Sequence, residues 1–207
     1  MVKIFGEFTV PIVRFLTKEE YATQLSQEGR ARLRSLESFH DMENDPREDK
    51  LEGTGRLAES NVPFVRGVNQ PVALEVVTTN PVYILCFSEA SADLKRLGGE
   101  LGSFVVHIDA PAILNRAVPD LEIESLPAGR QVVEVRIAQV RYDKDLVGEV
   151  GRDVRDAIPL AYTQKRPKDA YQREWRLAVV LSGPKEGAPE YILVRLPIAS
   201  PLRVSKL

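Results

Sequence analysis

The densest group of chemically useful side chains is the segment Tyr171-Gln-Arg-Glu-Trp-Arg176. It combines one carboxylate, two guanidinium groups and the single tryptophan of the chain at the point where a strand is expected to begin. Glu174 can serve as a catalytic carboxylate at a ligand site. In the structural alternative, Trp175 anchors the core and Glu174 pairs with an arginine of a neighbouring strand. The residue types alone leave both interpretations open.

A second candidate group is the series Arg30-Ala-Arg-Leu-Arg-Ser35. The arginines alternate with Ala31, Leu33 and Ser35, which is the period-two pattern of a strand with one solvent-exposed face. Three arginines on one face can hold phosphates, although solvated side chains are the more common outcome. This row therefore predicts a strand, and it offers a possible anion site.

Acidic and basic residues gather in two separate segments. Residues 41–52 hold six acidic against two basic residues, whereas residues 162–176 hold five basic against two acidic ones. Pro46 restricts its neighbour to an extended backbone, so the acidic segment is expected to be a loop. Because their charges are opposite, the two segments could meet.

The sequence predicts no metal site. His40 stands near Asp41 and Glu43, but a second histidine is missing nearby, so a surface histidine is expected. His107 lies in an apolar segment and is expected to be a hydrogen-bonded core residue. Cys86 lacks the further ligands of a zinc site, and its apolar neighbours predict a core thiol.

Length and composition restrict the class of protein. The chain has 207 residues, of which 43% are hydrophobic and 28% charged, so residues 1–207 are expected to form a single domain. No apolar run is long enough to cross a membrane, and no signal peptide is recognisable, which predicts a cytoplasmic protein without a membrane partner. The net charge of −2 gives no strong nucleic-acid signal, so any such binding must be local.

Strand patterns outnumber helical patterns and do not alternate with them regularly. The chain therefore predicts an α+β fold with a mixed, mainly antiparallel sheet and a few short helices. Helices are expected after Thr17, whose hydroxyl would cap with Glu20, after Ser88, where Gly98-Gly99 would end the helix, after Asp109, and over residues 143–161. Strands are expected in the ranges 12–16, 30–35, 72–79, 81–88, 103–109, 131–142, 175–181 and 191–196. The last two are expected to pair as a β-hairpin with a long loop.

Four short motifs in series resemble an uncharacterised family of bacterial and phage proteins, a domain-of-unknown-function group. The motifs are an early strand, Val13-Arg-Phe-Leu16, then Asn44-Asp-Pro-Arg-Glu48, Cys86-Phe-Ser88 and Glu174-Trp-Arg176. They follow the order and spacing of the family over most of the chain. The chain departs from the family after Cys86-Phe-Ser88, where an expected Trp-x-x-Tyr segment is replaced by residues 91–100, with only Leu94 and Leu97.

The same layout resembles, more distantly, the ADP-ribosyltransferases. That resemblance implies that Arg14 binds the pyrophosphate of NAD, that Ser88 holds the nicotinamide ribose, and that Glu174 is the catalytic residue. Gln172 belongs to the implied Gln-x-Glu motif, and Tyr171 or Phe39 would stack on the nicotinamide ring. NAD would be the substrate, with an unknown macromolecular acceptor and no metal.

Two functions from different classes follow. The first is an NAD-dependent ADP-ribosyltransferase-like or NAD-cleaving protein, which requires Arg14, Ser88 and Glu174 to line one cleft. The second is a non-catalytic binding module, associated with phage or defence, that has an unidentified protein partner and a structural Glu-Trp-Arg motif. The second function predicts that Glu174 is satisfied by a buried arginine, with Arg14 and Arg47 as the candidates.

Overall fold

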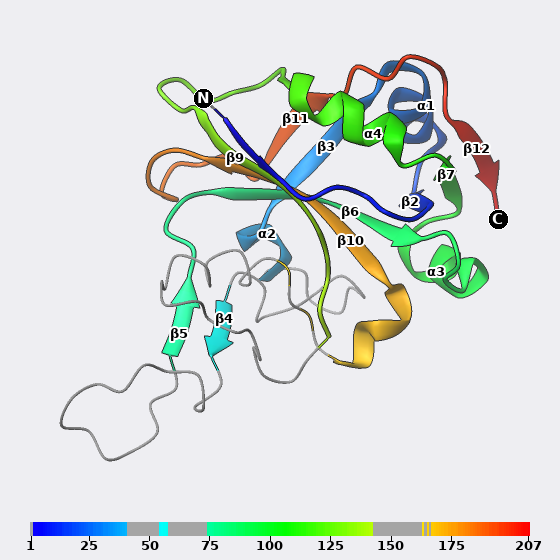
Figure 1. The fold of residues 1–207 in the computed structure, drawn as a ribbon, viewed down its shortest axis with the longest axis horizontal. Coiled ribbons are helices and arrows are strands. Elements are labelled where there is room, and N and C mark those ends of the chain that lie inside the picture. The colour runs from blue at the N-terminus through cyan, green and yellow to red at the C-terminus, as the bar shows by residue number, and fades with distance from the viewer. Residues whose placement is uncertain (1, 41–53, 58–73, 143–162, 164, 166) are drawn as a thin grey trace.

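The computed structural model describes residues 2–40, 54–57, 74–142, 163, 165 and 167–207. Ten strands of the described chain form one sheet, ordered β1-β9-β10-β6-β2-β7-β12 along its main path, with β3, β11 and β8 branching from β6 (Figure 1). The strands of this sheet are β1 Lys3–Phe5, β2 Ile12–Leu16, β3 Arg30–Ser35, β6 Val82–Glu89, β7 Phe104–Ile108, β8 Glu122–Ile123, β9 Val132–Gln139, β10 Glu174–Leu181, β11 Tyr191–Arg195 and β12 Arg203–Lys206. β4 Thr54–Leu57 and β5 Leu74–Val77 pair separately as a two-stranded sheet.

Short helices connect the strands. They are α1 Glu19–Glu28, α2 Glu37–His40, α3 Leu94–Leu101 and α4 Ala112–Ala117, with the 3₁₀ helices η2 Val118–Asp120 and η5 Pro167–Gln172. β1 pairs with β9 in parallel, and the other ladders described for the main sheet are antiparallel. The predicted α+β fold, with its mixed, mainly antiparallel sheet, is therefore confirmed.

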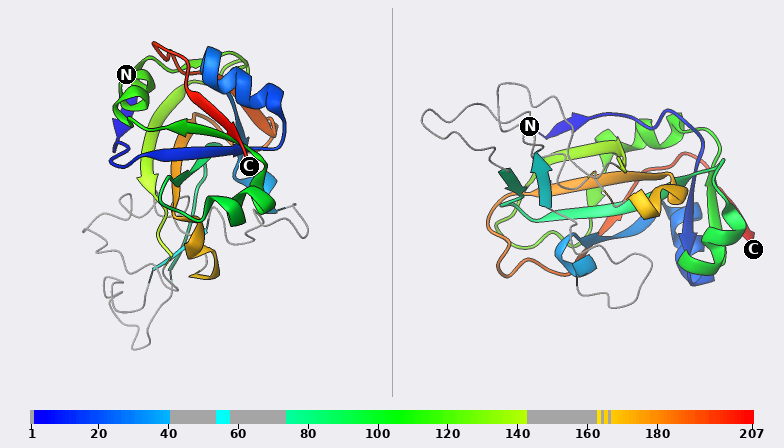
Figure 2. Two further views of the ribbon diagram at one scale, coloured as in Figure 1. Left: turned by 90° about the vertical axis from the view of Figure 1, so that its right-hand side faces the viewer. Right: turned by 90° about the horizontal axis from the view of Figure 1, so that it is seen from below.

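The core lies on both faces of the sheet. α1 and α4 lie over one face, as Figure 1 and the views of Figure 2 show, and contribute Leu25 and Leu114 to the largest apolar cluster. Trp175 belongs to the same cluster, with its ring centroid 5.9 Å from that of Phe8. A smaller cluster joins Leu97 of α3 to Val13 and Phe15 of β2 and to Val105 of β7. Trp175 thus anchors the core, as its apolar ring predicts.

β6 is the central strand of the sheet, as its apolar composition predicts. Seven consecutive residues of β6, from 82 to 88, pair with β10 along one edge. Six of its eight residues are buried, because the strand lies inside the sheet and is covered on both faces. This position places the Cys-Phe-Ser motif at the centre of the fold.

The expected β-hairpin between β10 and β11 is wrong. Both edges of β10 are occupied, one by β6 and the other by β9. β11 pairs instead with β3 and β8. Because each strand has only two hydrogen-bonding edges, β10 has no edge left for β11.

The helix ends correct two further expectations. α1 begins after Lys18 without a side-chain cap, so the predicted pairing of Thr17 with Glu20 is wrong, although the helix ends at Gly29 as expected. α3 is capped by Asp93 and continues through Gly98-Gly99 to Gly102. Gly98 does not stop the helix; a Cβ there would lie 2.5 Å from Leu207 Cδ1, so the C-terminal residue packs where a larger side chain would stand.

Two expectations cannot be compared with the structure in full. The expected helix over 143–161 and the acidic loop over 41–52 lie outside the described residues. The expected strand 72–79 is observed as β5, Leu74–Val77, in the small sheet rather than in the main one.

Candidate ligand-binding site

The main sheet divides along one edge of β6, and the candidate site lies where it divides. At its end, β6 pairs with β2 through Ser88 and Glu89, and at its start it pairs with β3 through Tyr83 and Ile84. Between these ladders, residues 85–87 of β6 have no strand partner on this edge within the described chain. β2 and β3 therefore separate and leave space between them.

Arg14 of β2 crosses this space. Its Nη1 atom donates a hydrogen bond of 2.6 Å to the backbone carbonyl of Cys86. At this position neither β2 nor β3 supplies a ladder hydrogen bond to β6. Arg14 supplies one in its place, and this matters because a buried carbonyl without a hydrogen bond lowers the stability of the fold. Arg14 thus has a structural contact at the place where the sequence predicts a phosphate ligand.

The inner cavity has a volume of about 70 Å³. Arg14, Ser88, Gln172 and Glu174 line it, so four of the five predicted site residues meet at one place. The strand register explains the convergence, since Ser88 lies opposite Glu174 on β10 and opposite Val13 on β2. The requirement that residues 14, 88 and 174 share a hollow is met, but the hollow is far smaller than the several hundred Å³ of an ordinary ligand pocket.

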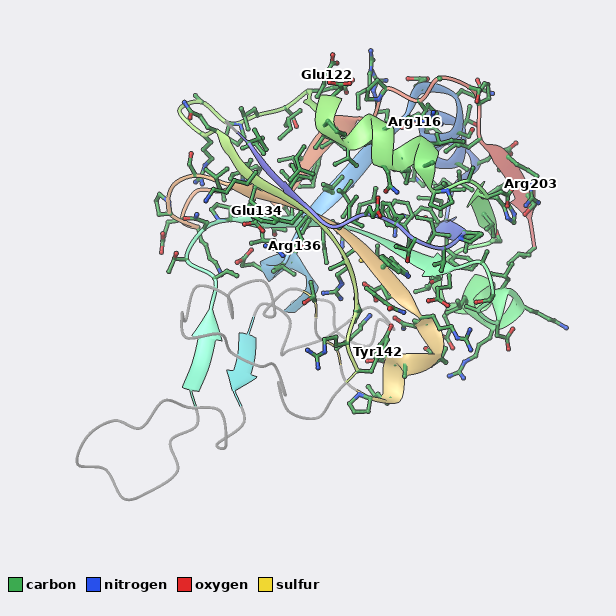
Figure 3. All side chains as sticks on the ribbon, in the orientation of Figure 1. Arg116, Glu122, Glu134, Arg136, Tyr142 and Arg203 are labelled. Carbon is green, nitrogen blue, oxygen red and sulfur yellow. The ribbon has the colours of Figure 1, made fainter. Side chains whose placement is uncertain are left out.

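Glu174 is buried in a polar cluster at this cavity. Its side chain is 5% exposed. Its Oε1 accepts a 2.6 Å hydrogen bond from Nε of Arg176, and its Oε2 accepts a 3.0 Å bond from Nζ of Lys165. The hydroxyl of Tyr142, which lies beyond the end of β9 (Figure 3), accepts a bond of 2.8 Å from the backbone N–H of Glu174. Both carboxylate oxygens are thus engaged with buried cations.

These cations determine the ionisation of Glu174. Burial by itself would raise the pKa of the carboxyl group, but the positive charges of Arg176 and Lys165 outweigh it and hold the pKa well below its ordinary value. Glu174 is therefore ionised and paired at neutral pH. A buried arginine does pair with Glu174, but it is Arg176 of the same strand rather than Arg14, and the other candidate, Arg47, lies outside the described residues.

Lys165 is the residue of this cluster that the sequence pattern did not single out. Its Nζ atom donates to Glu174 and also to Oε1 of Gln172, at 2.8 Å, so it joins two of the predicted site residues. Its position in the basic segment, nine residues before Glu174, gave no sign of burial. Only the path of the chain through η5 brings it back to the start of β10.

Tyr171 does not line the inner cavity. Its hydroxyl donates to Glu100 of α3, and the guanidinium carbon of Arg96 lies 3.5 Å from the centre of its ring. Tyr171 therefore connects η5 to α3, and a cation already covers the ring proposed for stacking. The side chain of Phe39, the other predicted stacking residue, is outside the described part of the structure.

A larger hollow continues outward from the inner cavity. This arginine groove has a volume of about 500 Å³ and shares Arg14, Phe15, Arg32, Arg34 and Leu101 with the cavity. Its described lining contains five cationic side chains and no carboxylate. The cations are Arg14, Lys18, Arg30, Arg32 and Arg34.

The arginines of β3 have unequal partners. Arg30 is held by Glu124 at 2.9 Å and Glu28 at 3.0 Å, and the hydrogen bonds that it donates to Glu124 raise its pKa. Arg32 and Arg34 lie 3.9 Å and 3.4 Å from one oxygen of Glu190, whose side chain is 57% exposed. Contacts this long to an exposed carboxylate contribute little to the free energy of folding.

His107 and Cys86 are the two further groups that the sequence singled out. His107 is buried, its Nε2 atom is 2.7 Å from the Ser205 hydroxyl, and burial lowers its pKa, which confirms the expected core histidine. Cys86 differs from the expected core thiol, since it is partly exposed and lines the inner cavity.

No three histidine, cysteine or acidic side chains of the described residues are grouped to hold a metal. None of the helices in that part of the chain is long and apolar enough to cross a membrane.

The chain was also compared with known proteins. Protein-family models, curated proteins and solved structures yielded no match to it. The resemblances to the phage and bacterial family and to the ADP-ribosyltransferases therefore remain predictions from motifs, and the function has to be argued from the site itself.

Proposed function

We propose that the protein is a binding module for a phosphorylated ligand, which it holds in the arginine groove. The observation that carries this proposal is the convergence of Arg14 from β2 with Arg32 and Arg34 from β3 on one hollow whose described lining has no carboxylate. Guanidinium groups bind phosphate oxygens through two parallel hydrogen bonds. A groove of about 500 Å³ has the size of an ordinary ligand site.

The state of Glu174 supports a binding role over a catalytic one. A carboxylate that assists departure of nicotinamide must face the substrate, whereas both oxygens of Glu174 already accept hydrogen bonds from buried cations. We therefore assign the Glu-Trp-Arg motif a structural role, in which Trp175 packs in the core and Arg176 neutralises Glu174.

The proposal is tested by isothermal titration calorimetry with pyrophosphate and ADP. Replacing both Arg32 and Arg34 by alanine should weaken binding about tenfold or more, because each charge-assisted hydrogen bond is worth roughly 1.5 to 3 kcal/mol. Arg116→Ala is the matched control, since this exposed arginine lies on α4 (Figure 3) and not in the groove. If wild-type protein binds neither anion at millimolar concentration, the proposal is wrong.

NAD cleavage or ADP-ribosyl transfer is the second candidate, and one observation favours it. Arg14, Ser88 and Glu174, the residues to which the resemblance assigns NAD binding and catalysis, do line the same inner cavity. This activity would require the cavity to widen and Glu174 to exchange Lys165 for the substrate ribose.

The second candidate predicts release of nicotinamide from NAD by the purified protein, measured by chromatography with and without cell extract. Glu174→Gln should abolish the release while the circular dichroism spectrum stays that of a folded protein. Absence of release from the wild type under both conditions would remove NAD turnover from consideration, and it would leave the binding proposal standing.

A further inference from the structure

We infer that the ligand of the arginine groove is a small phosphorylated polyol, whose phosphate lies in the groove and whose hydroxyl groups enter the inner cavity. This inference rests on the proposed function, because it names the class of phosphorylated ligand for the same site. Two buried side chains at the inner cavity, Ser88 and Gln172, carry it, since both keep hydrogen-bonding capacity for a guest.

The Ser88 hydroxyl is the first of these groups. Ser88 is 3% exposed and lies directly opposite Glu174 in the ladder between β6 and β10. Residues that lie directly opposite one another in a ladder direct their side chains to the same face, and both residues line the inner cavity. Within the described chain the hydroxyl makes no hydrogen bond. Because a buried hydroxyl without a partner destabilises a fold, a polar group that enters the cavity and bonds to Ser88 is stabilised there.

The side-chain amide of Gln172 is the second group. Gln172 is 2% exposed and is the last residue of η5. Its Oε1 atom accepts from Lys165, and its Nε2 atom donates to the hydroxyl of Tyr171 at 3.4 Å. An amide nitrogen carries two N–H groups, and the described residues provide no acceptor for the second. Ser88 and Gln172 therefore offer both donors and an acceptor at one small cavity.

The charges at the inner cavity favour a neutral guest. The two oxygens of Glu174 accept hydrogen bonds from Arg176 and Lys165. An anionic guest would meet the carboxylate of Glu174, and a cationic guest would meet the ammonium group of Lys165. A hydroxyl group carries no charge and both donates and accepts hydrogen bonds, so it matches Ser88 and Gln172.

The two hollows place the phosphate outside and the hydroxyl groups inside. The inner cavity of about 70 Å³ has room for a few water molecules, or for the hydroxyl-bearing end of a short carbon chain. It shares Phe15 and Leu101 with the arginine groove, and these apolar side chains suit the carbon atoms between the two ends of the ligand. The cavity contains Glu174, whereas the described lining of the groove contains no carboxylate, so the phosphate belongs in the groove.

The inference is tested by isothermal titration calorimetry of the full chain with glycerol 3-phosphate and with n-propyl phosphate. The two compounds have the same phosphate and the same three-carbon chain, and they differ in the two hydroxyl groups. Glycerol 3-phosphate should bind about tenfold or more tightly, because each neutral hydrogen bond contributes a factor of about five to the affinity.

One variant locates the hydroxyl groups. Ser88→Ala should lower the affinity for glycerol 3-phosphate about fivefold and leave the affinity for n-propyl phosphate unchanged, because it removes one hydrogen bond to a hydroxyl group. The unchanged affinity for n-propyl phosphate also reports that the variant is folded. Ser200→Ala is the matched control, since Ser200 is exposed and lines neither hollow, and it should bind both compounds as the wild type does.

The outcomes distinguish this inference from the proposed function. If pyrophosphate binds but glycerol 3-phosphate binds no more tightly than n-propyl phosphate, the polyol inference is wrong and the binding proposal survives. If Ser88→Ala keeps the full preference for glycerol 3-phosphate, the hydroxyl groups do not lie in the inner cavity, and the inference is again wrong. If none of these anions binds to the wild type, both proposals fail.

Discussion

The Glu174 carboxylate and the Lys165 ammonium group lie 3.0 Å apart, and both side chains are buried. Arg176 lies 2.6 Å from the other oxygen of the same carboxylate and is also buried. Removing one partner of a buried pair leaves a charge that neither water nor protein compensates. The Glu-Trp-Arg segment, which the sequence offers as a catalytic motif, therefore stabilises the fold.

Replacing Glu174 by alanine should lower the free energy of unfolding by about 3 to 5 kcal/mol, because the buried cations Lys165 and Arg176 each lose an ion pair. Urea denaturation measures the loss. Glu190→Ala is the matched control, since Glu190 is exposed, and it should cost less than about 1 kcal/mol. Equal midpoints for wild type and Glu174→Ala would contradict the structural role and favour the catalytic one.

The cluster also predicts how stability depends on pH. The pKa of Glu174 lies below its ordinary value in the folded protein, so the unfolded chain binds more protons in the acidic range. The stabilisation is complete above the ordinary carboxyl pKa of about 4.3 and is lost as the pH falls from there towards the depressed pKa.

Urea midpoints of wild type and Glu174→Gln, compared between pH 7 and pH 3, test this dependence. The difference between the two proteins should shrink as the pH falls, because the wild type loses a stabilisation that the variant never had. If the difference in midpoint stays constant from pH 7 to pH 3, ionisation of Glu174 is not the cause of the pH dependence of stability.

Gly29 should tolerate no side chain. It ends α1 with a φ of 67°, in the left-handed region, and a Cβ there would lie 1.8 Å from the backbone oxygen of Leu196. Gly29→Ala should therefore cost more than about 1 kcal/mol in thermal or urea denaturation.

Gly99 provides the matched control for this substitution. It lies inside α3, and a Cβ there would meet nothing within 4 Å in the described structure. Gly99→Ala should stabilise the protein by up to about 1 kcal/mol, because alanine is the better helix former. The opposite order of the two variants would contradict the placement of these helix ends.

His107 should titrate below its ordinary pKa of about 6.5, because burial disfavours the imidazolium form. The stabilisation that results is complete above that value and is lost as the pH falls through it, since the unfolded chain then binds a proton that the folded one refuses. Two-dimensional NMR of the imidazole signals, assigned with His40→Gln, measures the pKa directly. A value at or above 6.5 would contradict the buried contact with Ser205.

The sequence by itself determined the local elements and the fold class. The alternation of Arg30, Arg32 and Arg34 with apolar residues predicts β3, and Gly29 predicts the end of α1, because side-chain period and backbone freedom act over a few neighbouring residues. The apolar run of β6 correctly predicts its central position. The expected roles for Trp175 and His107 also follow from residue type, since both depend on burial.

The tertiary structure decided which strands pair and what the charged residues contact. The hairpin of β10 with β11 follows the order of the chain, but β6 and β9 occupy both edges of β10, and competition for edges is a property of the whole sheet. The groove exists because β2 and β3 share one edge of β6 and separate along it. Arg14 and Arg32 are distant in sequence from Tyr191 and from Lys165, and the charge and burial of each depend on neighbours that only the folded chain supplies.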